Sequence, residues 1–313
     1  FNVDRYMYTH QIEARLFKKF TFTALEGMFV NAPLELRFLN PWTIFHGMAP
    51  WREYEPDKSD PESHTCAYLG LKFQFVPVKN LKFYGNYAQT QYQTSYEMDN
   101  WPDNTTPNGI GYQLGTQFYI PLSKGRLKIS AEGSWADPYL YVKESPNWTL
   151  VRTYDENIGD KAVFYEWIGS PFGPDTTSGE FTVGYEVPGK FSLGLVYLYM
   201  ARGEYSGNRL FTKELDWGGV DMTEDPDFWA YPDSDVWGYN TAKIMQAFKG
   251  PHGIIEHVNR ISLRATCNYR NFVNLIIQPS YVIIINRNNV HGNSQNGFEF
   301  ALACEINLSR LVK

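Results

Sequence analysis

The feature that most constrains this chain is a strict two-residue alternation on both sides of a short Pro-Gly turn. In residues 179–200, GEFTVGYEVPGKFSLGLVYLYM, an apolar residue occupies every second position before and after Pro188-Gly189. These positions are Phe181, Val183, Tyr185, Val187, Phe191, Leu193, Leu195, Tyr197 and Tyr199. A period of two puts each apolar set on one face of a strand, and the turn reverses the chain. The segment therefore predicts an antiparallel β-hairpin.

The same unit recurs along most of the chain, with tight turns alternating with long polar connections. Besides the two strands of this hairpin, the expected strands are residues 3–17, 20–30, 65–75, 81–92, 110–120, 127–135, 261–269, 273–285 and 298–308. Residues 136–178 are the least regular, and 139–142 with 148–154 fit either another hairpin or an extension of a loop. We expect about twelve strands in all, the alternating pattern of an antiparallel transmembrane β-barrel with short periplasmic turns and long extracellular loops.

The residues between the apolar positions are polar, and many of them are charged. They include Glu13, Arg15, Lys72, Gln113, Gln117, Arg126, Lys128, Glu132, Glu180, Glu186 and Arg264. So many charges do not suit a dry core, but they do suit a wet lumen, and a closed barrel leaves no open sheet edge in lipid. We therefore predict an integral protein of the bacterial outer membrane, the alternative being a soluble all-β protein. The segment could also be part of a larger barrel.

Composition narrows the class further. The most apolar segment, residues 281–285, is far shorter than the roughly 18 apolar residues of a membrane-spanning helix. The 22 Tyr, 21 Phe and 9 Trp are side chains that barrels place at the lipid headgroups. A net charge of −6 argues against a nucleic-acid partner. Of the three cysteines, Cys267 and Cys304 fall on the apolar parity, so we expect small buried or lipid-facing residues and no disulfide framework.

No catalytic or metal-binding motif stands out. The six histidines form no HExxH pattern, so zinc is not expected, and no nucleophile-elbow, phosphate-loop or dinucleotide motif is present. His252, His257 and Glu256 are interpreted as solvated polar groups of a loop. A carboxylate pair for glycoside chemistry stays open, because sequence does not fix the distance between acids. We predict a non-enzyme with no cofactor and no metal.

One long loop combines aromatic and acidic residues. Between Phe211 and Trp237, the candidate polysaccharide-binding residues are Trp217, Trp229, Tyr231, Trp237, Asp225 and Asp227. Aromatic faces stack on the C–H faces of sugars, and carboxylates accept hydrogen bonds from hydroxyls or hold a cation such as calcium. The alternative is that the aromatic residues pack the loop onto the rim of the barrel and the acids only solvate it.

The opening segment carries a family resemblance. RYMYTHQIEARLFKKFTFTALEGMFV, followed by LELRFLNPWTIFH, resembles the capsule-assembly Wzi family over about the first fifth of the chain. The matching positions are Arg5, Tyr6, His10, Glu13, Arg15, Glu35, Leu36, Leu39, Asn40 and Pro41. The resemblance implies a large monomeric barrel, without catalytic residues, that helps to hold or organise surface polysaccharide. Its implied lumen and loop residues are Arg5, His10, Glu13, Arg15, Glu35, Arg37 and Asn40.

Read from the residues alone, the motif divides between two faces. Glu13 and Arg15 point inward with Arg5, whereas His10 lies on the other side of the strand, and these polar residues could merely satisfy one another in the lumen. Residues 34–39 fit a short plug or loop helix, ended by Asn40-Pro41.

Together these observations predict one barrel domain over residues 1–313, truncated at its N-terminus. The expected function is the assembly or surface attachment of capsular or extracellular polysaccharide, by a monomer whose partners are outer-membrane lipids and that polysaccharide. A general diffusion porin or solute channel is the alternative. An outer-membrane enzyme acting on lipids or glycans is a third possibility, which would require a carboxylate pair or a Ser-His arrangement to converge.

Overall fold

Almost all the regular structure of this chain is β-strand. The computed structural model describes residues 6–30, 36–40, 42, 44–45, 65–92, 94–100, 108–137, 140–141, 150–156, 162–204, 251–269 and 272–306. The helices in this part are short: η1 (Leu36–Leu39), α1 (Ser95–Asn100) and η8 (Arg287–Asn289). None of the described helices has the length and apolar character needed to cross a membrane.

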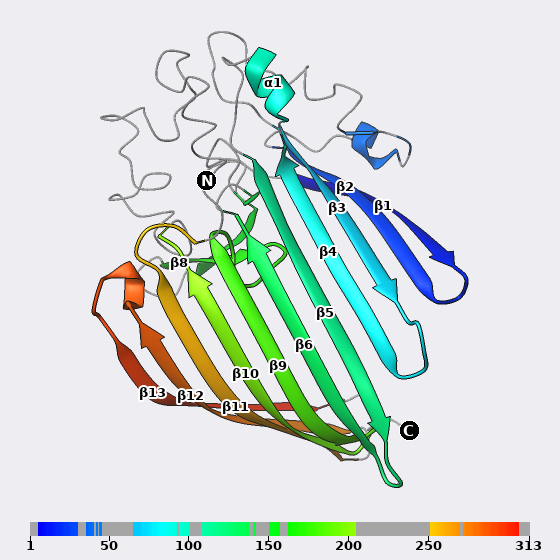
Figure 1. Ribbon diagram of the computed structural model, residues 1–313, viewed down its shortest axis with the longest axis vertical. Coiled ribbons are helices and arrows are strands. Elements are labelled where there is room, and N and C mark those ends of the chain that lie inside the picture. The colour runs from blue at the N-terminus through cyan, green and yellow to red at the C-terminus, as the bar shows by residue number, and fades with distance from the viewer. Residues whose placement is uncertain are drawn as a thin grey trace.

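Eleven strands form one antiparallel sheet in which each strand pairs with its neighbours along the chain (Figure 1). They are β1 (Tyr6–Leu16), β2 (Phe20–Val30), β3 (Thr65–Phe75), β4 (Leu81–Gln91), β5 (Gly109–Pro121), β6 (Arg126–Ala136), β9 (Thr176–Val187), β10 (Phe191–Arg202), β11 (Glu256–Tyr269), β12 (Val273–Ile285) and β13 (Gln295–Ile306). A separate hairpin, β7 (Val151–Glu156) and β8 (Ala162–Trp167), interrupts the series between β6 and β9. The predicted all-β antiparallel class is confirmed.

Residues 139–142 and 148–154 fitted either another hairpin or an extension of a loop. Of the first segment, the structure describes Leu140 and Tyr141, which are not in a strand but are buried in a small apolar cluster, whereas residues 151–154 belong to β7. The hairpin that does form pairs Val151 with Trp167. Burial of two large side chains thus replaces the expected strand alternation.

The connections alternate in length as the sequence indicated. At one end of the sheet, the turn end, strands are joined by residues 17–19, 76–80, 122–125, 188–190 and 270–272. At the other, the loop end, they are joined by residues 31–64, 92–108, 137–175, 203–255 and 286–294. Gly189 has a φ of +72°, which a type II turn requires after Pro188. Phe17 and Lys18 both have positive φ, the conformation of a type I′ turn, whose twist matches that of the flanking strands.

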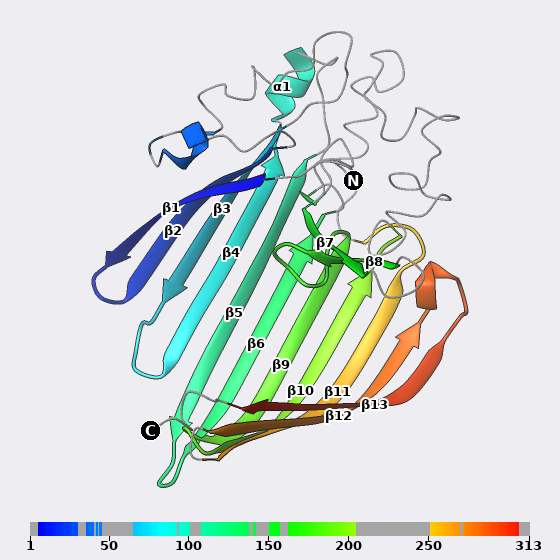
Figure 2. The same cartoon turned by 180° about the vertical axis from the view of Figure 1, so that it is seen from behind.

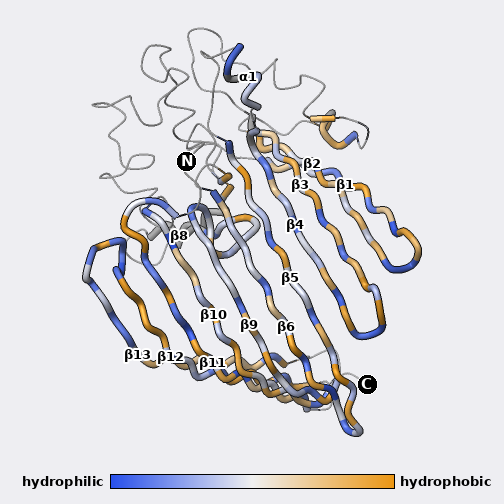
Figure 3. Tube along the Cα trace, viewed as in Figure 1, coloured by the Kyte–Doolittle hydropathy of each residue, from blue (hydrophilic) through white to orange (hydrophobic). Residues whose placement is uncertain are grey.

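The pairing registers place the two parities on opposite faces of the whole sheet. Residues directly opposite each other share a face, and one such row runs from Ile129 through Val183 and Leu195 to Leu263. The alternation is visible along the strands in Figure 3. The sheet is strongly curved, with its hollow side toward the viewer in Figure 2, where the β7–β8 hairpin lies over it. We call the apolar side the convex face and the polar side the concave face.

The convex face is not covered by a second sheet among the described strands. Many of its large apolar side chains are open to the surroundings, with Leu195 and Ile261 each 53% exposed and Phe300 60% exposed. Over these strands the apolar parity is therefore largely open to the surroundings, except near the loop end of β1 and β2, where Met28 and Val30 are buried. Cys267 and Cys304 lie on this face and are exposed, free cysteines.

Within the described residues, a small core lies near the loop end on each face of the sheet. On the concave face, Phe29 and Ala136 pack with Leu140, Tyr141 and Leu150. On the convex face, Tyr8, Met28 and Val30 pack with Phe38 and Phe45. The second core shows that Phe38 and Phe45 cover the convex side of β1 and β2 there. Of the plug and the loop helix that residues 34–39 were expected to form, the structure shows a short helix, η1, on the convex side of the sheet.

The described sheet is open, because β1 and β13 are its two edges. Closure into a cylinder therefore stays a prediction.

Candidate functional site: the concave face and its rim

The concave face collects the charged parity that the sequence predicted for the lumen. The registers place all eleven residues on this face: Glu13, Arg15, Lys72, Gln113, Gln117, Arg126, Lys128, Glu132, Glu180, Glu186 and Arg264. They come from six of the eleven strands, so the alternation of side chains within each strand is enough to build a polar wall.

Cross-strand pairs neutralise part of this charge. The Arg126 Nε donates to the Glu186 carboxylate, and the Arg260 Nη2 donates to the Glu299 Oε2 at 2.6 Å. Because these groups are partly exposed, each pair contributes about 1 kcal/mol or less to stability. Their main effect is to neutralise four charged groups of the concave face, so that the charges outside these pairs determine which ligand the face attracts.

An aromatic residue crosses this wall over a glycine. The Tyr84 ring lies where a side chain on Gly115, its direct cross-strand partner, would stand, since a Cβ there would be 2.3 Å from the ring. The Tyr84 hydroxyl reaches the next strand and donates to the Glu132 Oε2 at 2.5 Å. Gly115 is therefore required for the close approach of a ring, which fixes the orientation of Glu132.

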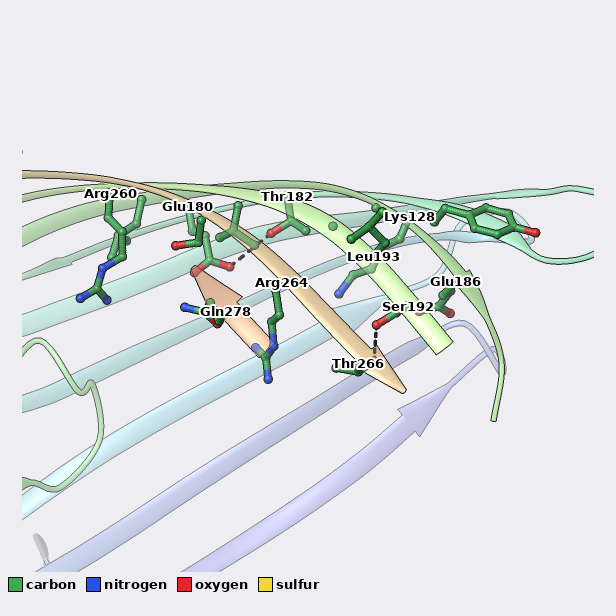
Figure 4. A pocket seen from close by; sticks show the side chains of 16 residues that line it. Lys128, Glu180, Thr182, Glu186, Ser192, Leu193, Arg260, Arg264, Thr266 and Gln278 are labelled. Atoms are coloured by element: carbon green, nitrogen blue, oxygen red, sulfur yellow. Dashed lines mark hydrogen bonds between the residues drawn. The ribbon is translucent and has the colours of Figure 1, made fainter. Parts of the chain in front are cut away.

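The concave face contains a hollow of about 410 Å³ between β6, β9, β10, β11 and β12 (Figure 4). Its charged lining residues are Lys128, Glu180, Glu186, Arg260 and Arg264, and it also carries the hydroxyls of Thr182, Ser192 and Thr266. Ligand pockets commonly measure roughly 300–1,000 Å³. This hollow is therefore large enough for a small polar molecule or one unit of a polymer.

A second polar cluster, which we call the rim cluster, ties strands together at the loop end. The Asp175 carboxylate is fully buried, lies 2.9 Å from the His252 Nδ1, and accepts a hydrogen bond from the His252 backbone N–H at 3.1 Å. The Asp175 carbonyl accepts from the Gly203 N–H, and a Cβ on Gly203 would stand 1.8 Å from the Asp175 carboxylate. Only glycine fits at position 203. The hydrogen bonds of Asp175 to Gly203 and His252 hold together the start of β9, the end of β10 and the residues just before β11.

The rim cluster continues onto the β12–β13 connection. Glu256 pairs with Arg202 and accepts a hydrogen bond from the Asn288 N–H at 2.8 Å. The Asn289 amide donates to the carbonyls of Arg202 and Ile254. The interpretation of Glu256, His257 and His252 as solvated loop groups is therefore wrong. Glu256 and His257 lie on β11, and His252 and Glu256 are largely buried.

Sequence reasoning missed the rim cluster because its partners are far apart in the chain. Asp175 and His252 are separated by 77 residues. The short Gly-Pro-Asp and Pro-His-Gly sequences at 173–175 and 251–253 signal turns, but nothing in them indicates that these turns meet.

A third feature lies beside the concave core, where the β7–β8 insert meets the wall. The Tyr141 hydroxyl accepts a hydrogen bond from the Ser170 N–H at 2.9 Å. Burial raises the pKa of Tyr141, while its hydrogen bonds to Ser170 oppose that shift. The insert therefore occupies part of the concave side at the loop end with packed protein.

The motif residues of the opening segment do not form one site. Glu13 and Arg15 are exposed on the concave face, while His10 lies on the convex face, as predicted. The His10 ring stacks on Phe45 at 4.5 Å between centroids, and its Nε2 is 3.4 Å from the Phe38 carbonyl. His10 thus helps to hold Phe38 and Phe45 against the convex side of β1.

The remaining motif residues belong to the segment that His10 holds. Asn40 directly follows η1, and its Oδ1 accepts a hydrogen bond from the Trp42 N–H at 3.1 Å. Arg37 lies in η1. Arg5 and Glu35 lie outside the described residues, as do the predicted loop residues Trp217, Trp229, Tyr231, Trp237, Asp225 and Asp227.

Chemically, the concave face presents charges and hydroxyls that can bind a hydrophilic ligand. Among the residues placed by the structure, no three His, Cys, Asp or Glu side chains come together to hold a metal ion. The prediction of a non-enzyme stays a prediction.

No protein-family profile matches the chain, and no curated protein matches it. Two solved structures are similar at low level. The NanC porin aligns with 96% of this chain and 98% of its own at a TM-score of 0.29 and 6% identity. LpxR from Salmonella typhimurium aligns with 93% of this chain and 86% of its own at a TM-score of 0.29 and 11% identity. Scores this low do not establish a shared architecture, so the class of the protein rests on its own strand pairing: an up-and-down antiparallel sheet with an exposed apolar face and a polar concave face.

Proposed function

We propose that this chain forms an integral β-barrel of the bacterial outer membrane, with its convex face in lipid and its concave face in water. The observation that carries the proposal is that the registers place the mainly apolar parity of all eleven strands on one face of the sheet. Soluble monomers rarely expose an apolar patch larger than a few hundred Å². A sheet that exposes large apolar side chains over most of one face, and carries charged side chains on the other, suits hydrocarbon outside and water inside.

Within that class, we propose that the protein serves the assembly or surface attachment of a polysaccharide. Two features support this role over that of a wide general porin. The opening segment resembles the capsule-assembly Wzi family, and the apolar cluster around Tyr141 and Leu150 occupies part of the concave side at the loop end. A packed insert restricts free diffusion, while the hollow below it still offers polar groups to a glycan. Binding rather than catalysis is the role proposed, for a monomer.

The membrane part of the proposal is tested by folding the purified chain into phospholipid vesicles. We expect a protein that needs detergent or lipid to stay monodisperse and that migrates differently on a gel before and after heating. A chain that stays monodisperse without detergent and shows no heat-dependent mobility would contradict the membrane assignment.

The polysaccharide part is tested by planar-bilayer conductance together with co-sedimentation of capsular or extracellular polysaccharide with the vesicles. We expect little steady current and retention of polysaccharide. A large, steady open current without retention would favour the diffusion porin instead.

A further inference from the structure

One row of residues across the concave face combines two cations with two glycines. The registers place Lys128 opposite Gly184, Gly184 opposite Gly194, and Gly194 opposite Arg264. Residues directly opposite one another share a face, and neighbouring strands are about 4.8 Å apart, so the two cationic Cα atoms are separated by about 14 Å. We call this row the glycine trough.

The floor of the glycine trough is bare backbone. A Cβ on Gly184 would stand 3.1 Å from the Gly194 Cα, which is tighter than ordinary contact. A Cβ on Gly194 would meet its nearest atoms at 3.5 Å, so a side chain fits there without displacing the backbone. With no side chain between Lys128 and Arg264, a flat ligand can lie directly on the two strands.

The charge around the trough favours an anion. The carboxylate of Glu186 is engaged by Arg126, and Arg260 is engaged by Glu299. Of the other charged lining residues, Glu180 carries one negative charge against the two positive charges of Lys128 and Arg264. No described carboxylate lies within ion-pair distance of either Lys128 or Arg264. Figure 4 shows these two side chains on the same side of the sheet, within the hollow. The trough therefore has a cation at each end and no described acid bound to either.

Hydroxyl and amide groups complete the surroundings. Ser192 and Thr266, one row away, are hydrogen-bonded to each other at 2.5 Å, and Thr182 and Gln278 also line the hollow. Such groups both donate and accept, so they suit the hydroxyls of a sugar ring better than an isolated inorganic ion. A planar guanidinium at one end suits a carboxylate, which it can hold through two hydrogen bonds.

We propose that the glycine trough is a binding site for an acidic sugar unit, with the ring over Gly184 and Gly194 and its carboxylate held by Arg264 or Lys128. This inference rests on the proposed polysaccharide role and adds to it the class of glycan, a carboxylate-bearing one. A glycan chain crossing the four strands would place successive acidic units within reach of both cations.

The test is titration calorimetry of the detergent-solubilised full chain with tetragalacturonate, and with maltotetraose as the neutral probe of equal length. Arg264→Gln and Lys128→Gln remove one charge each, Arg264→Lys keeps it, and Gly194→Val fills the trough without touching a charge. Lys72→Gln and Gly297→Val are matched controls, because both positions lie on the concave face away from the trough, and a Cβ on Gly297 meets nothing within 4 Å.

We expect tetragalacturonate to bind and maltotetraose to bind at least tenfold more weakly. A charge-assisted contact is worth a factor of about ten or more, so each Gln variant should weaken the acidic probe by about that factor. Arg264→Lys should lose less, Gly194→Val should lose most of the binding, and the two controls should match the wild type. Rising salt should weaken binding of the acidic probe alone.

Three results would overturn the inference. They are equal binding of the two tetrasaccharides, unchanged binding in both Gln variants, and competition by inorganic phosphate as strong as that by the acidic sugar, which would indicate a site for any small anion. Equal binding of both probes would still leave a glycan-binding barrel, whereas failure of vesicle insertion would remove the proposed function itself. The two failures are therefore distinguishable.

Discussion

The membrane assignment makes a sharp prediction about a single arginine placed at different depths and on different faces of one strand. β10 has 12 residues, and Leu195, near its middle, is 53% exposed on the convex face. Its neighbour Val196 lies on the concave face and lines the hollow. Phe191, at the turn end of the same strand, is 44% exposed on the convex face. Under the membrane assignment, an arginine at Leu195 meets the centre of the lipid bilayer, one at Val196 meets water, and one at Phe191 meets the membrane interface.

The expected depths follow from strand geometry. A rise of about 3.4 Å per residue and a tilt of about 40° give about 2.6 Å of height per residue. Leu195 then lies about 4 Å, and Phe191 about 14 Å, from the mid-height of the strand, while the apolar band of a barrel extends about 12 Å to either side. Leu195 is therefore in the middle of the band and Phe191 is at its edge.

The costs follow from these depths. Arginine on the lipid face costs about 2–4 kcal/mol at the midplane and about 0–1 kcal/mol near the interface. We expect Leu195→Arg to lower the free energy of unfolding by about 2–4 kcal/mol, and Phe191→Arg by less than about 1 kcal/mol. Val196→Arg should change it by less than about 0.5 kcal/mol, because its side chain meets water.

The assay is urea-dependent folding into phosphatidylcholine vesicles, followed by tryptophan fluorescence and heat-dependent gel mobility. With a slope of about 2 kcal/mol per molar urea, Leu195→Arg should move the midpoint by about 1–2 M. If the convex face met water, an arginine at this half-exposed position would cost almost nothing. Equal midpoints for Leu195→Arg and wild type, or an equal loss for Val196→Arg, would therefore refute the assignment of the two faces.

Three further predictions concern the loop end. Asp175→Ala leaves the His252 side chain and backbone N–H without their acceptor, so we expect the free energy of unfolding to fall by about 3 kcal/mol. This loss is measured as a lower urea midpoint. An unchanged midpoint would contradict the structural role of the rim cluster. Because burial raises the folded-state pKa of Tyr141, its contribution to stability is present below the unfolded-state pKa and is lost as pH rises above it. The urea midpoint of the wild type should therefore fall more steeply above about pH 10 than that of Tyr141→Phe, and parallel pH profiles would argue against this. Trp42 is 84% exposed beside the apolar convex face, so Trp42→Phe should reduce the quenching of total fluorescence by brominated lipid, whereas equal quenching would place residues 36–45 away from the membrane.

The strands themselves could be predicted because successive side chains of a strand alternate between an apolar and a polar side, and this alternation is visible in the sequence. Each residue from Phe181 to Tyr199 meets either the convex or the concave side according to its parity, and parity is visible in the sequence. The Pro188-Gly189 turn is equally local, since the positive φ at Gly189 is a property of that residue. The eleven strands of the sheet and the division of their charges therefore needed no tertiary information.

The candidate site required the registers as well as the parity. Parity assigned Lys128 and Arg264 to the concave face, but only the pairing of four strands places them in one row with two glycines between them. The rim cluster is even harder to predict from the sequence, because Asp175 and His252 are separated by 77 residues. Contacts of that range depend on how many residues each connection contributes to the sheet, which no local pattern encodes.

The sequence by itself determined that this chain forms antiparallel ribbons with one apolar and one charged side, since side-chain alternation is set within each strand. Only the tertiary structure decided that the apolar sides of eleven strands lie on one convex face and that Phe38 and Phe45 pack onto it. It also decided that an acid and a histidine of separate loops close the rim. The physical reason is that the face on which a side chain lies is set by its position within one strand. A row across the sheet, a hollow or a buried ion pair depends on how several strands pair with one another.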